Sequence, residues 1–278
     1  MSTDYDFRLI YFPVRARLEP ILLRIVDAGV PFQLEEIPLA AWSQWKKTHQ
    51  IARDKFPFSG VPILRAKYGG KELVLGETSA ILTFLDETLA PAGTHHQGRD
   101  LPLDVRVHIQ MIKEASLFFL GRSLQMSGSS EVSVIVFVSF PVADQDCHQW
   151  LAPPQRTITR KGMVARYLKN TEGALHDLQR SIRVVPLPTD QLSGMTTAVV
   201  TAITVIRDLF PSTREMLMEG GEYELLGRLW HTVHGRPRIK EYWEKNQIEQ
   251  KAWTITEYGT AEWIAKEAAS FDKPASLL

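Results

Sequence analysis

The sequence predicts a small α/β domain followed by a larger all-helical region, and three observations support this prediction. Residues 1–90 alternate strand-like and helix-like apolar patterns, a rhythm typical of α/β folds. Residues 91–102 form a linker rich in Gly, Pro and His, the composition of a loop between domains. Residues 103–250 then show long helical periodicities with almost no strand pattern, so the two regions belong to different structural classes.

The first half of the α/β domain is predicted to be a strand–helix–strand unit. Residues 8–12 form a short apolar strand that ends at Pro13. Apolar residues then recur every three or four positions over 18–26, and Gly29 suits the end of that helix. Residues 32–37 alternate between apolar and polar, as a half-buried strand does.

The second half of this domain is predicted to be a hairpin followed by a helix. Residues 61–64 and 72–75 are strand candidates on either side of the turn Gly69-Gly70. Residues 77–89 place their large apolar side chains on one side of a helix. The stretch 38–59 has no clear pattern, so the predicted order is βαβ followed by ββα.

Four helices are predicted in the second region, at 103–126, 160–184, 196–210 and 222–246. An unusual insert at about 127–158 separates the first two and carries a run of β-branched residues at 131–140. It is a functional lid, a packed irregular segment or a gene-model artefact. Residues 251–278 form a C-terminal tail.

Composition and charge argue against several classes of protein. The chain has 278 residues, 44% of them hydrophobic, with 32 basic residues against 32 acidic ones. A dedicated nucleic-acid binder carries a basic stripe, and none is present. The single cysteine, Cys147, excludes a disulfide framework and a cysteine-rich metal site. The polar N-terminus is unlike a secretory signal, and the apolar run 132–140 is too short to span a bilayer, so we expect a cytoplasmic protein that contacts no membrane.

Four strings of residues resemble the glutathione transferase superfamily. Residues 9–17, Leu-Ile-Tyr-Phe-Pro-Val-Arg-Ala-Arg, resemble the first strand-to-helix junction of its tyrosine-type classes, which usually have Gly where this chain has Ala16. Residues 57–64 resemble the loop with the family's cis-proline, and 77–82 its Gln/Glu-Ser motif. Residues 229–239 resemble the penultimate helix and its turn. The resemblance implies a thioredoxin-like domain followed by an all-helical domain.

The resemblance gives Tyr11 a catalytic role. The thiol of glutathione has an ordinary acidity, with a pKa near the cysteine reference of about 8.5. A hydroxyl that donates a hydrogen bond to sulfur stabilises the thiolate and makes it a nucleophile at neutral pH. Tyr11 ends the first strand just before a helix, so its phenol is the expected donor.

The same resemblance assigns residues to glutathione itself. A cis bond between Val61 and Pro62 would present the backbone groups of Val61 to the bound peptide. Glu77 would face the γ-glutamyl ammonium, and Thr78 would offer a hydroxyl and a helix N-terminal amide to a carboxylate. The other interpretation of this pair is ordinary helix capping.

Three further residues would bind the glycine end of glutathione: Arg17, Trp42 and Lys46. Lys47 and Arg53 are alternatives to Lys46, because the loop varies in length. The helical region would supply the pocket for an apolar second substrate, from Phe118, Phe119 and Arg122, with Phe12 added from the first domain. An aromatic stripe at helical spacing is otherwise typical of a core.

The resemblance therefore predicts an enzyme that activates the glutathione thiol for addition to an apolar electrophile, working as a homodimer. One alternative is a glutathione-dependent cis–trans isomerase of a conjugated double bond, such as fungal members supply in natural-product pathways. Another is a non-catalytic binding or regulatory protein with the same fold. The chain departs from the family at the buried sixth helix, where Thr196 lacks the usual Asp three residues later.

Overall fold

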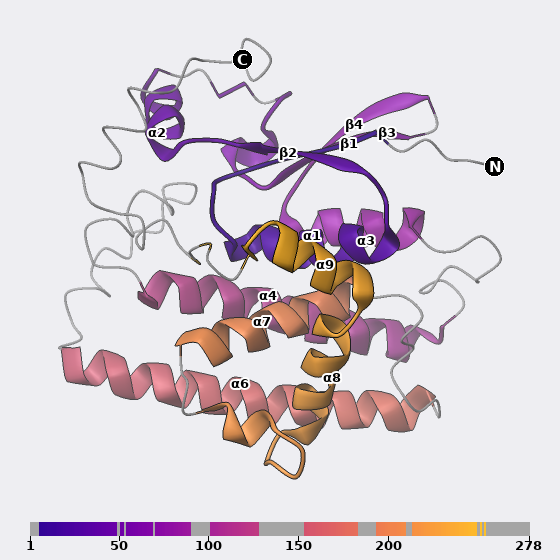
Figure 1. The fold of residues 1–278 in the computed structure, drawn as a ribbon, viewed down its shortest axis with the longest axis vertical. Coiled ribbons are helices and arrows are strands. Elements are labelled where there is room, and N and C mark those ends of the chain that lie inside the picture. Colours follow the sequence, from indigo (N-terminus) through magenta and orange to yellow (C-terminus); the bar gives the residue numbers. More distant parts are fainter. Residues whose placement is uncertain are drawn as a thin grey trace.

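The computed structural model describes residues 6–48, 51–52, 54–68, 70–89, 101–127, 153–182, 193–209, 213–248, 251 and 253. Most of the predicted linker, insert and tail lies outside these residues, and so does Cys147. Figure 1 shows a sheet that forms one layer, with α1 and α3 beneath it and the long helices of the second region below those.

The sheet has four strands in the order β2-β1-β3-β4. β1 runs parallel to β2, and β3 is antiparallel to both β1 and β4. This is the predicted βαβ–ββα order, because one helix joins β1 to β2 and another follows the hairpin. The elements are β1 (Asp6–Tyr11), α1 (Glu19–Ala28), β2 (Phe32–Glu36), α2 (Leu39–Lys47), β3 (Ile63–Tyr68), β4 (Lys71–Gly76) and α3 (Thr78–Thr88).

Helix α2 lies in the stretch 38–59, which shows no clear pattern in the sequence. Its buried face is built from Ala41, Trp42 and Trp45, which pack on Phe56. Large aromatic residues have only moderate helix propensity, so tertiary packing rather than local preference stabilises this short helix.

Within the described residues, the regular elements of the second region are all helices. Their bounds differ from the predicted ones. The predicted helix 222–246 is two helices, because Pro237 begins a new one after a turn at Gly235. The helix predicted from 160 begins at Pro153, so the predicted insert extends six residues too far. The elements are α4 (Leu103–Ser127), α6 (Pro153–Ile182), α7 (Gly194–Leu209), α8 (Glu224–His234) and α9 (Pro237–Lys245).

Helix α1 is shared by the two hydrophobic cores. Ile21 and Ile25 pack with the sheet, whereas Leu23 and Val26 pack with the helices of the second region. Its polar residues are buried as well, and Arg24 is only 2% exposed. A helix that is covered on all sides joins the two regions into one packed unit.

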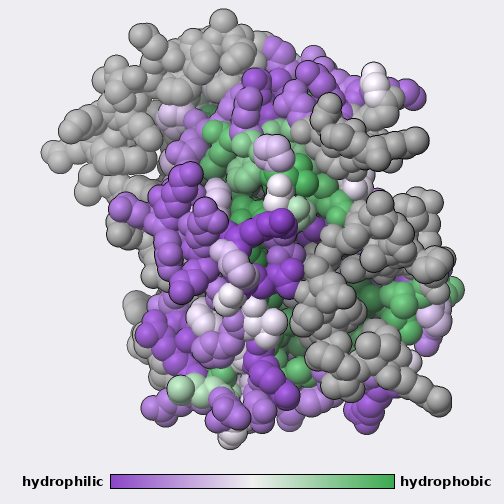
Figure 2. Space-filling view, turned by 45° about the vertical axis from the view of Figure 1, so that its right-hand side comes forward, coloured by the Kyte–Doolittle hydropathy of each residue, from purple (hydrophilic) through white to green (hydrophobic). Residues whose placement is uncertain are grey.

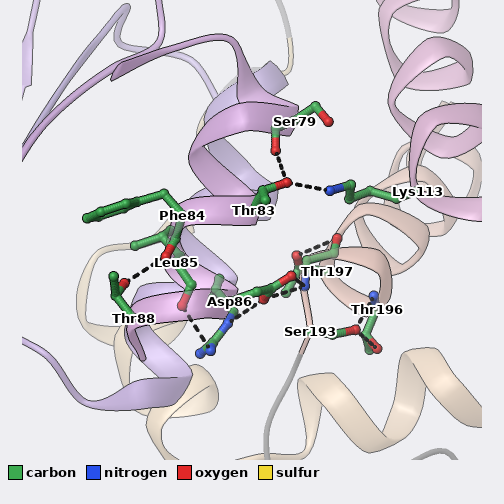
Figure 3. A network of polar contacts seen from close by, with 12 residues as sticks. Ser79, Thr83, Phe84, Leu85, Asp86, Thr88, Lys113, Ser193, Thr196 and Thr197 are labelled. Carbon is green, nitrogen blue, oxygen red and sulfur yellow. Dashed lines mark hydrogen bonds and ion pairs between the residues drawn. The ribbon is translucent and has the colours of Figure 1, made fainter. Parts of the chain in front are cut away.

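The buried helix α7 has an N-terminal cap that the sequence did not predict. Ser193 is the capping residue, since its Oγ accepts the backbone N–H of Thr196 at 3.2 Å. The carboxylate of Asp86, on α3, accepts the N–H of Gly194 at 2.9 and 3.0 Å (Figure 3). The expectation that Thr196 is the Thr of the capping motif is therefore wrong: Ser193 is the cap, Thr196 stands where the motif has its Asp, and the distant Asp86 provides the acid at this helix start.

Candidate active site

Tyr11 ends β1 with its side chain buried and its hydroxyl directed at the following turn. Its Oη accepts the backbone N–H of Arg17 at 3.3 Å. Burial raises the pKa of Tyr11, although the charge of Arg17 and this hydrogen bond both oppose the shift. The phenol therefore keeps its proton at neutral pH, and that proton is available to an acceptor because the Arg17 contact uses only the oxygen.

The turn between Tyr11 and α1 has an unusual backbone conformation. Ala16 begins a short 3₁₀ helix, η1 (Ala16–Leu18), with φ at +33°. Glycine adopts positive φ without the clash that a Cβ causes, which explains why the resembling family usually has Gly here. The alanine is accommodated, and the turn still brings the N–H of Arg17 to Tyr11.

Thr78 connects this turn to the start of α3. It is buried, and its Oγ1 donates to the backbone carbonyl of Arg17 at 3.4 Å. Tyr11, Arg17 and Thr78 are thus brought together. The Thr78 hydroxyl was expected to bind a ligand, but its proton already goes to Arg17. Its backbone N–H, in the first turn of α3, is the group suited to an anion.

Glu77 immediately precedes α3 and is exposed, with a positive φ of 64°. The other predicted anchor, the Val61–Pro62 bond, is cis. The ladder of β3 with β1 and β4 begins at Ile63. The backbone N–H and C=O of Val61 therefore lie beyond the paired part of β3, where an extended peptide can pair with them.

Trp42 and Phe12 are packed in the first core. Phe12 lies between Tyr11 and Trp42, with ring centroids 5.4 and 5.8 Å away. Phe12 is 7% exposed and Trp42 4%. The ammonium nitrogen of Lys46 is 5.7 Å from the Trp42 ring centroid, and burial lowers the pKa of Lys46. Lys47 is exposed, and Arg53 lies outside the described residues.

The two phenylalanines predicted for the second-substrate pocket have opposite surroundings. Phe118 is 69% exposed, and the guanidinium of Arg122 is 5.8 Å from its ring centroid. Phe119 is 3% exposed and stacks on Tyr167 at 4.1 Å. The prediction for Phe119 is wrong, because its ring belongs to the core between α4 and α6.

The sequence analysis missed Gly121, on α4. A Cβ at this position would lie 3.3 Å from Nη2 of Arg17, so the absent side chain makes room for the guanidinium. This contact places Arg17 against α4, although the prediction grouped it with residues of α2. A glycine inside a helical pattern often has such a packing reason, and that signal was present in the sequence.

Three solved structures are similar to the chain over most of its length. The pi-class glutathione S-transferase of Onchocerca volvulus is 19% identical, with 89% of this chain and 97% of that one covered and a TM-score of 0.56. The sigma class GST of Fasciola hepatica is 17% identical, with coverages of 87% and 97% and a TM-score of 0.55. NaGST-2 is 16% identical, with the same coverages and a TM-score of 0.56. The chain has the glutathione transferase fold. No protein-family model and no curated protein sequence matches it.

Two features, a membrane-spanning helix and a metal-binding cluster, are absent from the described residues of this glutathione transferase fold. None of those helices is both long and apolar enough to cross a membrane. Within the same residues, no three His, Cys, Asp or Glu side chains are grouped so that they could hold a metal ion.

Proposed function

We propose that this protein is a glutathione transferase in which Tyr11 stabilises the glutathione thiolate. The observation that carries the proposal is the hydrogen bond from the Arg17 N–H to Tyr11 Oη. It fixes the phenol oxygen and leaves its proton to donate to sulfur. A donor held in position before the reaction lowers the free energy of the developing anion without reorganisation.

Glutathione binds along the edge formed by Val61 and the start of α3. The backbone of Val61 pairs with the peptide, Glu77 faces its ammonium group, and the Thr78 N–H binds a carboxylate. Lys46 supplies a positive charge beside Trp42 for the glycine carboxylate. These assignments rest on the resemblance, together with the cis Val61–Pro62 bond, the position of Glu77 and Thr78 at the start of α3, and the place of Lys46 beside Trp42.

The apolar electrophile binds on the side of α4. Arg17 reaches this helix at Gly121, and Phe118 with Arg122 presents an exposed ring and a charge there. The thiolate attacks the electrophilic carbon and a carbon–sulfur bond forms. Either the bond to a leaving group breaks and that group departs with the electron pair, or a conjugated π bond breaks and the resulting carbanion takes a proton from water. If the same thiolate adds to a conjugated double bond and later leaves, the product is an isomer instead of a conjugate. We place the reaction in the cytoplasm.

The enzyme works as a homodimer in this proposal, through the exposed apolar side chains of α4 and the loop before β3. Leu103, Val107 and Met111 are between 48% and 68% exposed, and Phe58 is 71% exposed. A patch of this kind on a soluble protein marks an interaction surface. Figure 2 shows further hydrophobic surface, in the upper part of the face that it presents.

The deciding experiment compares the wild type with Tyr11→Phe, using Tyr242→Phe on α9 as the matched control. We expect all three to bind reduced glutathione in calorimetry with micromolar-to-millimolar Kd. Only the wild type and the control should show the thiolate absorbance band. Loss of one positioned donor should lower kcat by about 10²- to 10³-fold.

The outcomes separate the candidate functions. A conjugate or an isomer detected by mass spectrometry and chromatography identifies the reaction. Binding without either product and without the thiolate band supports a non-catalytic protein. Failure of the wild type to bind glutathione overturns the proposal altogether.

A further inference from the structure

Arg207, in the last turn of α7, is held in place by an aromatic ring. Its guanidinium carbon lies 3.9 Å from the ring centroid of Trp230, on α8. The indole N–H of Trp230 donates to Thr204 Oγ1 at 3.0 Å, which fixes the ring. Nη1 of Arg207 is buried and has no hydrogen-bond partner. An orphaned buried donor of this kind requires a physical explanation.

A second arginine adds positive charge at the same turn. Nε of Arg214 donates to the backbone carbonyl of Arg207 at 3.1 Å. Burial and the charge of Arg214 lower the pKa of Arg207, and Asp208 opposes this shift. Asp208 is already engaged, since one of its oxygens accepts from Arg15 at 3.2 Å and from Trp253 at 2.8 Å.

His234, which also lies beside Trp230, does not balance the charge. His234 stacks on Trp230 at 4.4 Å, and its Nε2 lies 3.3 Å from Thr204 Oγ1. Burial lowers the pKa of His234 to about 4, helped by Arg15 and Arg207. The imidazole is therefore neutral at pH 7. In the described part of the chain, neither Arg207 nor Arg214 forms an ion pair.

We propose that Arg207 and Arg214 form a binding site for an oxyanion, a carboxylate or a phosphate, separate from the site around Tyr11. A guanidinium presents N–H donors in a planar fork that matches both kinds of oxyanion. Stacking on Trp230 orients this fork before the ligand arrives, so little conformational freedom is lost on binding. The ligand pairs with the accessible part of the half-buried Arg207 side chain, since Nη1 itself is closed to solvent.

The end of α7 opposes an anion only weakly. The last carbonyls of a helix carry about half a negative charge. Arg214 already donates to one of these carbonyls, that of Arg207. Two full positive charges therefore outweigh the helix dipole at this position.

The test follows the indole N–H signal of Trp230 by NMR, assigned with Trp230→Phe. The full chain is titrated with sodium phosphate and, separately, with sodium succinate, each against sodium chloride at equal ionic strength. We expect a saturable shift in the millimolar range with at least one oxyanion and none with chloride. A response to phosphate alone identifies a phosphate ligand, and a response to succinate alone identifies a carboxylate.

Variants of Arg207 test whether the shift of the Trp230 signal reports binding at this arginine. Arg207→Gln should abolish saturation, and Arg207→Lys should weaken binding at least tenfold, because the charge is kept and the fork is lost. The matched control is Arg228→Gln, on the same helix as Trp230. The Arg228 side chain is 69% exposed and pairs with Glu224, so this variant should bind the oxyanion as the wild type does. A shift that never saturates, an equal response to chloride, or an unchanged response in a folded Arg207 variant would overturn the proposal.

Discussion

Asp86 joins three helices, and its removal should destabilise the protein more than that of any exposed acid. From α3, one carboxylate oxygen accepts from Nε of Arg24, on α1, at 3.0 Å. Both oxygens accept from the N–H of Gly194, at the start of α7. Arg24 is 2% exposed and Asp86 29% at their side chains, so the pair is largely withdrawn from water.

The size of the effect follows from two losses. Removing one partner of a buried ion pair leaves the other charge unpaired and costs about 3–5 kcal/mol. Losing a helix cap costs about 1 kcal/mol. Because Asp86 is partly exposed, water reaches the vacated site, and we expect Asp86→Ala to lower the free energy of unfolding by about 3 kcal/mol, near the lower limit. Asp86→Asn keeps an acceptor for Gly194 and should lose about half as much.

The measurement is urea unfolding at pH 7, followed by circular dichroism, with Asp177→Ala as the control. Asp177 is 64% exposed at its side chain and pairs with Arg180 within α6, so its loss should cost less than about 1 kcal/mol. An Asp86→Ala variant as stable as the control would refute the reasoning. It would mean that Ser193 alone caps α7 and that Arg24 gains another acceptor.

Three further predictions concern burial, acid sensitivity and assembly. Phe119→Ala should lower the free energy of unfolding by about 3–5 kcal/mol in the same urea titration. Met218 is 57% exposed, so Met218→Ala should change this free energy by less than about 1 kcal/mol. His234 has a pKa of about 4 in the native state, below its value in the unfolded chain, so the native state binds fewer protons and stability falls as the pH drops from about 6.5 toward 4. Between pH 7 and pH 5 the free energy of unfolding of the wild type should fall by about 2 kcal/mol more than that of His234→Gln. Equal losses in the two proteins would contradict this. Met111→Glu, on the exposed face of α4, should convert the proposed dimer to a monomer in light scattering, whereas Met218→Glu should not.

The order of strands and helices could be predicted from the sequence because local periodicity determines it. Within α4, the same periodicity did not predict which of two neighbouring aromatic residues is buried. Phe118 and Phe119 are one residue apart and point to different surroundings, solvent and core. The helix carries exposed apolar residues opposite its buried ones, so hydrophobicity alone does not identify the core face. Only the position of Tyr167, nearly fifty residues later, determines that Phe119 is the buried ring.

Around Tyr11, local sequence determines only the short-range contacts. Tyr11 and Arg17 are six residues apart, so the turn between them determines their contact and the turn has a recognisable sequence. Gly121 was missed because its function appears only when Arg17 lies beside it. The contact of Asp86 with the start of α7 was missed for the same reason, since Asp86 and Gly194 are 108 residues apart. The physical requirement was nevertheless readable, because a buried helix must satisfy its first N–H groups. When no local acid is present, an acceptor from elsewhere in the fold has to accept these N–H groups. Here that acceptor is Asp86, which also connects α3 and α1 to the helical region.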